Sequence, residues 1–273
     1  MRRFVGVLFA LLVVCSGCSG SDDPASPGGS ATAAEGGSIT LDSLDLDWPA
    51  ADGELDPGRR PATPAGFDDE TLDEMASVLT DWAQVAAVDG AVWHGASPVE
   101  QIADAVPAPV AKALRARVAK IVSPRLSVAN VFADDVTVVG SPHVTTAWDV
   151  SKQKDKSGRT YALLELQTRT AYEVRLDDGP SRVIGMLRVQ GLYAYEGATD
   201  DLGVSFGWQE FGAGDCSLAL DDELVPDSDV ADAKKDLATF VAVGNGAKLD
   251  MPPLPPQEQV DDDYLKRCRD GSI

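Results

Sequence analysis

Histidine and cysteine are scarce in this chain of 273 residues, which holds two histidines and four cysteines. His94 and His143 do not lie at a spacing typical of paired metal ligands, and His143 follows the turn sequence Ser141-Pro142. The acidic stretch at residues 227–232 lacks the glycine and the closing glutamate of a calcium-binding loop. The sequence therefore predicts neither a metal site nor a cofactor.

Positive charge is scarce as well. Lys and Arg total 23 against 44 Asp and Glu, which gives a formal net charge of −21. Nucleic acid and anionic lipid surfaces repel a chain this acidic, because their phosphates carry charge of the same sign. We therefore exclude nucleic acid as a partner.

Long apolar runs are also scarce, and the one that stands out covers residues 4–14 behind a basic start. It is shorter than the roughly 20 apolar residues of a membrane-spanning helix, and it fits a secretory signal peptide. The following Cys15-Ser16-Gly17-Cys18 resembles a bacterial lipoprotein signal, although Cys15 stands where leucine is usual. The resemblance implies a signal peptide over residues 1–17 and lipidation of Cys18. An ordinary signal peptide with incidental cysteines is the alternative.

The composition changes after the apolar run. Residues 19–38 consist of Ser, Gly, Ala, Pro, Thr, Asp and Glu. Such a stretch buries too little apolar surface to offset the entropy lost on ordering, which predicts a flexible tether. We expect the lipidated cysteine and tether over residues 18–64 and an α+β domain over residues 65–250. A proline-rich spacer and a C-terminal helix should follow over residues 251–273.

Two cysteines would remain after processing, Cys216 and Cys268. In an exported protein such a pair is expected to form a disulfide. Closing a loop of about 50 residues would add roughly 4 kcal/mol of stability on the chain-entropy model. A reactive thiol at Cys216 is the alternative.

The period of the apolar residues changes from helical to extended along the domain. Leu72, Met75, Leu79 and Trp82 recur at three- and four-residue steps, which predicts a helix over residues 68–89. Further helices are expected from residue 98 and over residues 110–122, 229–243 and 260–269. Period-two alternation predicts strands over residues 127–139, 144–150, 161–176, 182–196 and 202–211.

The same alternation predicts which side chains of the sheet face the helices. This apolar set comprises Leu164, Leu166, Tyr172, Val174, Val189 and Tyr193. The polar set expected on the opposite face comprises Glu165, Gln167, Arg169 and Arg188.

Helices followed by long antiparallel strands are the order of an α+β fold, with N-terminal helices packed on a curved antiparallel sheet. Residues 66–215 resemble the cystatin-like or NTF2-like cone, in which helices cross one face of a bent sheet. That resemblance implies a cavity between sheet and helices that can hold a ligand. The stretches LQTRTAYEV and WQEFGAGDCSLALDDELVPD are also similar to uncharacterised actinobacterial lipoproteins, a resemblance that implies no activity.

Polar residues of the sheet are the candidates for a functional site. The candidate ligand-binding residues are Gln167, Arg169, Arg188 and Gln190. Glu165 or Asp149 would be the general base if the site were catalytic. The alternative is that these side chains form the solvated face that an antiparallel sheet commonly has.

These features favour a lipid-anchored protein on the extracytoplasmic face of the cell membrane. It would bind an envelope protein or a small ligand without catalysis. An enzyme with an NTF2-like cavity, a hydrolase or an isomerase, is one alternative. A structural subunit of an envelope complex is another.

Overall fold

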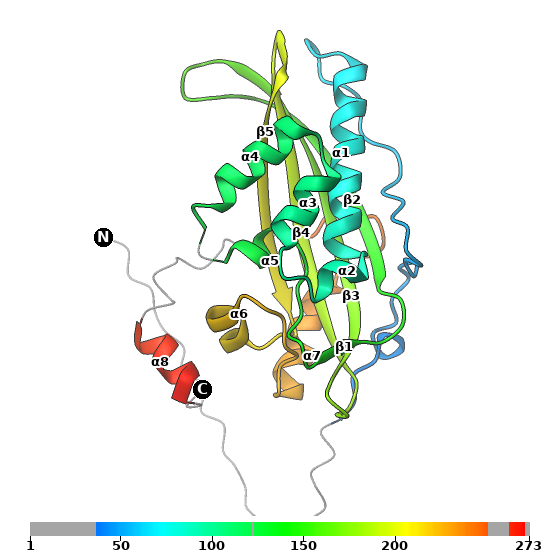
Figure 1. Cartoon of the computed structure of the whole chain (residues 1–273). Coiled ribbons are helices and arrows are strands. Elements are labelled where there is room, and N and C mark those ends of the chain that lie inside the picture. The colour runs from blue at the N-terminus through cyan, green and yellow to red at the C-terminus, as the bar shows by residue number, and fades with distance from the viewer. Residues whose placement is uncertain (1–36, 122, 251–261, 271–273) are drawn as a thin grey trace, which may run out of the picture. The chain divides into compact units, whose positions relative to one another are not determined.

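A computed structural model describes residues 37–121, 123–250 and 262–270 of the chain. The predicted signal peptide, Cys18 and the proline-rich spacer lie outside these described residues. The fold is α+β, and helices cover one face of a five-stranded antiparallel sheet (Figure 1). Among the described residues, no helix has both the length and the apolar character needed to cross a membrane.

The longest helix, α1 (Asp69–Ala87), confirms the helix predicted from its apolar spacing. The Asp68 carboxylate caps it by accepting a hydrogen bond from the Thr71 amide, at 2.7 Å. Leu72, Met75, Leu79 and Trp82 are fully buried on its inner side. The shorter helices that follow are α2 (Gly90–Trp93), α3 (Pro98–Ala105), α4 (Ala108–Val118) and α5 (Pro124–Val128).

The sheet is built around its longest strand. The strands are β1 (Val136–Val138), β2 (His143–Lys154), β3 (Thr160–Leu176), β4 (Arg182–Tyr195) and β5 (Ala198–Phe211). β3 pairs with both β1 and β2, and β4 pairs with β3 and with the edge strand β5. The strand predicted over residues 127–139 is wrong for most of its length. Pro124 occupies the first turn of α5, where a missing N–H costs nothing, and β1 pairs over three residues only.

Both faces of the sheet are covered, over different lengths. We call the side packed under α1, α3, α4 and α5 the helix face and the opposite side the outer face (Figure 1). Helix α7 (Val230–Phe240) and the short helix η1 (Leu41–Leu44) contact the outer face near Ala171, Val183 and Leu187. The rest of the outer face, toward the β2–β3 and β4–β5 turns, holds half-buried side chains.

The domain begins earlier than predicted. The sequence predicts residues 37–64 as part of the tether, yet Ile39, Trp48 and Leu55 are buried in the domain. The Ile39 amide donates to the Ser181 carbonyl at 2.9 Å, and the Ala51 amide donates to the Pro142 carbonyl at 2.8 Å. These few apolar anchors offset the entropy of ordering the segment without any regular period, so a periodicity argument does not detect them.

The predicted face of β4 is also wrong. On β3, Leu164, Leu166, Tyr172 and Val174 do lie in the core under the helices. Thr168 of β3 pairs directly with Arg188 of β4, so Arg188 lies on the helix face, not the opposite one. The outer-face partners of β4 are instead Val189, which pairs with Gln167, and Tyr193, which pairs with Leu163. Both faces of β4 are largely apolar, so its own alternation could not choose between them.

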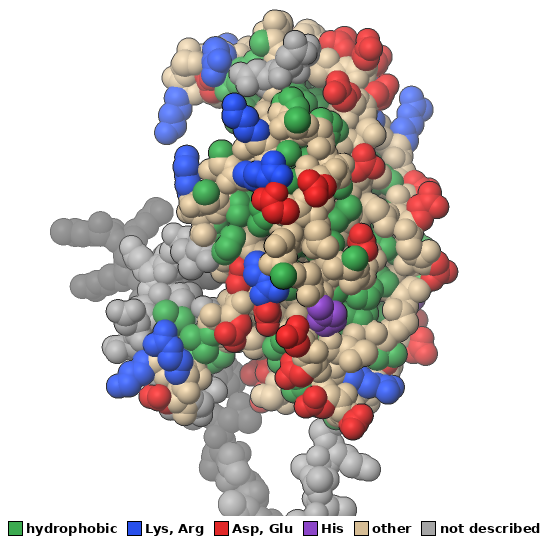
Figure 2. All heavy atoms as spheres, viewed as in Figure 1, with side chains coloured by type: hydrophobic (Ala, Val, Ile, Leu, Met, Phe, Trp, Pro, Cys, Tyr) green, Lys and Arg blue, Asp and Glu red, His purple; other side chains and the backbone are tan. Residues whose placement is uncertain are grey.

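The C-terminal helices are joined by the predicted disulfide. Cys216 of α6 (Asp215–Asp221) is bonded to Cys268 of α8 (Asp262–Asp270), with their Cα atoms 5.2 Å apart. Charge is unevenly distributed on the helix face, where Lys and Arg gather over α4 and Asp and Glu line the side of α1 (Figure 2).

Candidate functional site

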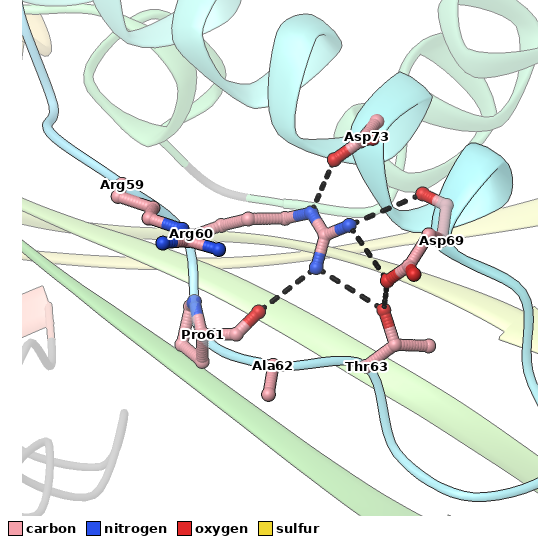
Figure 3. Close-up of a pocket in the computed structure, with 7 residues that line it drawn as sticks. All are labelled: Arg59, Arg60, Pro61, Ala62, Thr63, Asp69 and Asp73. Atoms are coloured by element: carbon pink, nitrogen blue, oxygen red, sulfur yellow. Dashed lines mark hydrogen bonds and ion pairs between the residues drawn. The ribbon is translucent and has the colours of Figure 1, made fainter.

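The described residues form two notable hollows, and the larger lies where the N-terminal segment meets α1. Its volume is about 830 Å³. The lining residues are Arg59, Arg60, Pro61, Ala62, Thr63, Asp69 and Asp73 (Figure 3).

Arg60 has no donor left for a ligand in this hollow. Its Nε donates to Asp73 at 2.6 Å, and its Nη2 donates to the carboxylate and the carbonyl of Asp69, both at 3.2 Å. Its Nη1 donates to the Pro61 carbonyl at 2.9 Å and to the Thr63 hydroxyl at 3.2 Å (Figure 3). A guanidinium has five N–H groups, and all five are engaged. Arg60 therefore ties the N-terminal segment to the first turns of α1.

The second hollow is a groove on the outer face of the sheet, with a volume of about 310 Å³. We call it the outer-face groove. Its lining residues are Glu165, Gln167, Val189, Ser205, Phe206, Gly207, Lys248, Leu249 and Asp250. Strands β3, β4 and β5 form its floor, and the segment after α7 forms its wall.

One row of paired residues crosses the floor. Asp149 pairs with Glu165, Glu165 pairs with Gly191, and Gly191 pairs with Ser205, so the side chains of this row share one face. A Cβ at Gly191 would overlap the Ser205 hydroxyl and crowd Glu165, so a glycine is needed for both to lean over this position. The Ser205 Oγ is buried and has no hydrogen-bond partner in the described part of the chain, which is unfavourable for a hydroxyl.

The wall is held by side chains that project from the outer face. Gln167 binds both backbone groups of Leu249: its Nε2 donates to the carbonyl at 2.8 Å, and its Oε1 accepts from the amide at 2.6 Å. The Thr145 hydroxyl bonds to the Asn245 side chain at 2.6 Å and accepts from the Gly246 amide at 2.7 Å. These bonds place Lys248 and Asp250 beside Glu165.

Arg169 anchors the beginning of the same segment. Its Nη1 donates to the carbonyls of Phe240 and Val243, at 3.0 and 2.8 Å. Its Nη2 donates to the carbonyls of Gly244 and Ala247, at 2.6 and 3.2 Å. The guanidinium also lies 4.5 Å from the ring centre of Trp48. Burial lowers the pKa of Arg169 to about 10. A cation at the end of α7 satisfies carbonyls that the helix leaves unpaired.

The charged side chains at the groove differ in whether they are paired. Lys248 Nζ lies 2.6 Å from the Asp149 carboxylate, and this hydrogen bond raises the pKa of Lys248. Glu165 has no hydrogen-bond or ion-pair partner among the described residues. Burial raises the pKa of Glu165, Lys248 opposes that shift, and Asp149 adds to it.

Three tyrosines continue the outer face beyond the groove. The ring centres of Tyr161, Tyr193 and Tyr195 lie 5.5 to 6.0 Å apart. Tyr193 pairs with Leu163, one row away from Glu165, and its ring covers Gly203, where any Cβ would overlap it. All three tyrosines are half-buried. Contiguous rings that keep a solvated surface are typical of binding surfaces.

Arg188 and Gln190 lie on the helix face and are fully buried there. Arg188 donates to the Asn130 side chain and to the carbonyls of Leu126 and Ala129, and Asn130 donates to the Tyr172 hydroxyl at 2.6 Å. Burial lowers the pKa of Arg188 to about 9. The side-chain oxygen and nitrogen of Gln190 are buried, and no described residue bonds to either of them. This network joins α5 to the sheet, away from the outer-face groove.

The structure therefore divides the predicted site residues. It brings Glu165, Asp149 and Gln167 together, gives Arg169 a role in anchoring the wall, and places Arg188 and Gln190 on the other face. Lys248, Asp250 and Ser205 also line the groove, although the sequence pattern did not predict them as site residues. Gly203 and Gly207 were a sequence signal for the groove. They lie four residues apart on β5, so both lack a side chain on the same face of the strand.

Within the described ranges, no group of three or more His, Cys, Asp or Glu residues is arranged to hold a metal ion. Comparison of the chain with protein-family models, with curated proteins and with solved structures gave no significant match.

Proposed function

We propose that this protein is a non-catalytic binding module, anchored by lipid at the extracytoplasmic face of the membrane, which binds its ligand on the outer face. The observation that carries the proposal is the outer-face groove. There the Glu165 carboxylate and the buried Ser205 hydroxyl, neither of which has a partner among the described residues, adjoin the tyrosine surface. Polar groups left unpaired beside an apolar surface favour binding of a ligand that pairs them.

Binding is better supported than catalysis. A general base works best in a site that excludes water and holds a second group in reach of the same substrate. The outer-face groove is open, and Asp149, the second candidate base, is paired with Lys248. The raised pKa of Glu165 is the one observation that favours the alternative, an acid–base enzyme.

We also propose that the fold is of the NTF2-like or cystatin-like type. Helices crossing one face of an antiparallel sheet support this. The helix face is filled, however, by mainly apolar side chains and by the buried network of Arg188, and the notable hollow of the sheet is on the other side. A ligand on the outer face would therefore use a surface different from the cavity expected of that fold.

Lipid anchoring rests on the Ser16-Gly17-Cys18 sequence and on the tether composition that follows. The Cys216–Cys268 disulfide supports an oxidising compartment. Mass spectrometry of the mature N-terminus from the native host tests the anchor. A diacylated or triacylated Cys18 is expected, and an unmodified N-terminus beyond Cys18 would contradict it.

Photo-cross-linking in the native host tests the binding face. A photoreactive phenylalanine analogue replaces Tyr193 in one strain and the exposed Lys112 of α4 in another. We expect a discrete adduct from position 193 and none from position 112. Adducts from position 112 alone, or equal yields from both, would contradict the proposal.

A further inference from the structure

The outer-face groove has more negative charge than its cation can neutralise. Glu165 and Asp250 line it together with Lys248, and Lys248 is already bonded to Asp149 at 2.6 Å. Three carboxylates therefore surround one ammonium group. Glu165 is the carboxylate of this set that is half-buried and has no partner within the described ranges.

Apolar side chains flank this carboxylate. Val189 lies in the row on one side of Glu165, opposite Gln167, and Leu163 and Tyr193 form the row on the other side. The Leu163 side chain reaches over Gly191 together with Glu165 and Ser205. A molecule in the groove would thus meet an acid at its centre and an apolar or aromatic surface beside it.

We infer that the outer-face groove binds an organic cation, namely an ammonium or guanidinium group carried on an apolar stem. The head group would pair with Glu165 and donate to the Ser205 hydroxyl, and the stem would lie against Leu163 and Tyr193. A charge-assisted hydrogen bond to a partly desolvated carboxylate is stronger than a neutral one. Aromatic faces attract the same cations. This assignment deepens the proposed function, on which it rests, by naming its ligand class.

The charge of the whole chain agrees with this choice. With a formal net charge of −21, the protein attracts cations and repels anions over long distances. General attraction alone does not select the groove, so the test has to separate site binding from charge.

The test is a titration of the folded chain lacking residues 1–18 but otherwise complete, followed by ¹⁵N amide chemical shifts. The probes are spermidine, acetyl-lysine methylamide and acetyl-arginine methylamide. Malonate and glucose serve as the anionic and neutral controls. The inference requires saturable shifts, with at least one of the three cations, at residues 163–167, 189–193, 203–207 and 248–250. Tighter binding of spermidine indicates a free polyamine, and tighter binding of an amino-acid amide indicates a side chain of a partner protein.

Glu165→Gln keeps the shape of the side chain and removes its charge. It should weaken binding about tenfold or more, because the charge-assisted bond is lost. The matched control is Asp178→Asn, which makes the same charge change at the exposed β3–β4 turn and should leave binding within about twofold. Ser205→Ala should weaken binding less than Glu165→Gln.

Three results would each overturn the inference. They are chemical-shift changes spread over the whole acidic surface, equal weakening of cation binding by Glu165→Gln and Asp178→Asn, and no saturable binding of any cation. Tighter binding of malonate or glucose would overturn it as well. None of these results bears on cross-linking from position 193. Adducts at position 193 without cation binding would therefore refute the proposed ligand class but not the proposed binding function.

Discussion

Gln167 and Leu249 exchange two hydrogen bonds, as two paired strand residues would, although one partner is a side chain. The side-chain amide of Gln167 therefore pairs with the backbone of a segment that lies across the outer face. It holds the segment that carries Lys248 and Asp250 against the sheet. The outer-face groove exists because this segment is fixed against the strands.

Gln167→Ala should lower the free energy of unfolding by about 1–2 kcal/mol, since it leaves both backbone groups of Leu249 without their partner. It should also speed hydrogen exchange of the Leu249 amide. The control is Gln209→Ala, a half-buried glutamine of β5 on the same face with no hydrogen bond among the described residues. Equal effects of the two substitutions in denaturant unfolding would argue against the bond.

The bonds of Gln167 were not predictable from the sequence, although the face on which Gln167 lies was. The alternation along β3 correctly separated Leu164 and Leu166 from Glu165 and Gln167. It could not show that residues 243–249 return to cover that second face, because the covering segment has no regular period. Its anchors are single polar side chains whose partners lie about 80 residues away.

β4 shows a different limit. Ile184 and Met186 belong to the core under the helices, while Val183 and Leu187 belong to the core under α7. A strand buried on both faces has no polar side to give its register. The pairing of Thr168 with Arg188 decides the register, and that pairing is visible only in the folded sheet.

Arg188→Met should be strongly destabilising, by about 3 kcal/mol or more, because it leaves the Asn130 side chain and two carbonyls buried without a donor. The alternation along the sequence predicts Arg188 on the solvated face instead, where the substitution would cost little. Arg175→Met, at an exposed position of β3, is the control and should change stability by under about 0.5 kcal/mol. Denaturant unfolding of both variants decides between the two placements.

Removing the disulfide should lower the stability of the fold. Cys268→Ser should cost roughly 4 kcal/mol on the chain-entropy model, while the circular dichroism of the sheet remains. The double variant with Cys216→Ser should match the single one, because both lack the same bond. Peptide mapping without reduction should yield one cross-linked pair of peptides. Two alkylatable thiols in the native protein would contradict the bond.

The raised pKa of Glu165 gives a pH dependence of known sign. A carboxyl group whose pKa is raised by folding stabilises the fold below its unfolded value, near 4.5, and this contribution is lost as the pH rises through the folded value. Glu165→Gln should therefore match the unmodified protein at low pH and become the more stable of the two toward neutral pH.

Glu100→Gln should change the pH dependence of stability in the opposite direction. The Arg115 hydrogen bond lowers the pKa of Glu100, so this carboxylate stabilises the fold above its unfolded pKa and ceases to do so as the pH falls. The variant should be the less stable one at neutral pH, and the difference should vanish in acid. Unfolding curves measured from pH 3 to pH 8 compare both variants, and parallel profiles would refute the assigned environments.

We propose above that the outer face is the binding surface of a protein outside the cytoplasm. The most direct measurement is labelling of single cysteines by a membrane-impermeant maleimide, in intact cells of the native host and in the purified protein. Tyr193→Cys reports on the outer face, and Lys112→Cys reports on the exposed side of α4. Position 112 should react equally in both settings, whereas position 193 should react in the purified protein and be protected in cells. Equal reactivity of position 193 in the two settings, or labelling of position 112 only after cell lysis, would contradict the account.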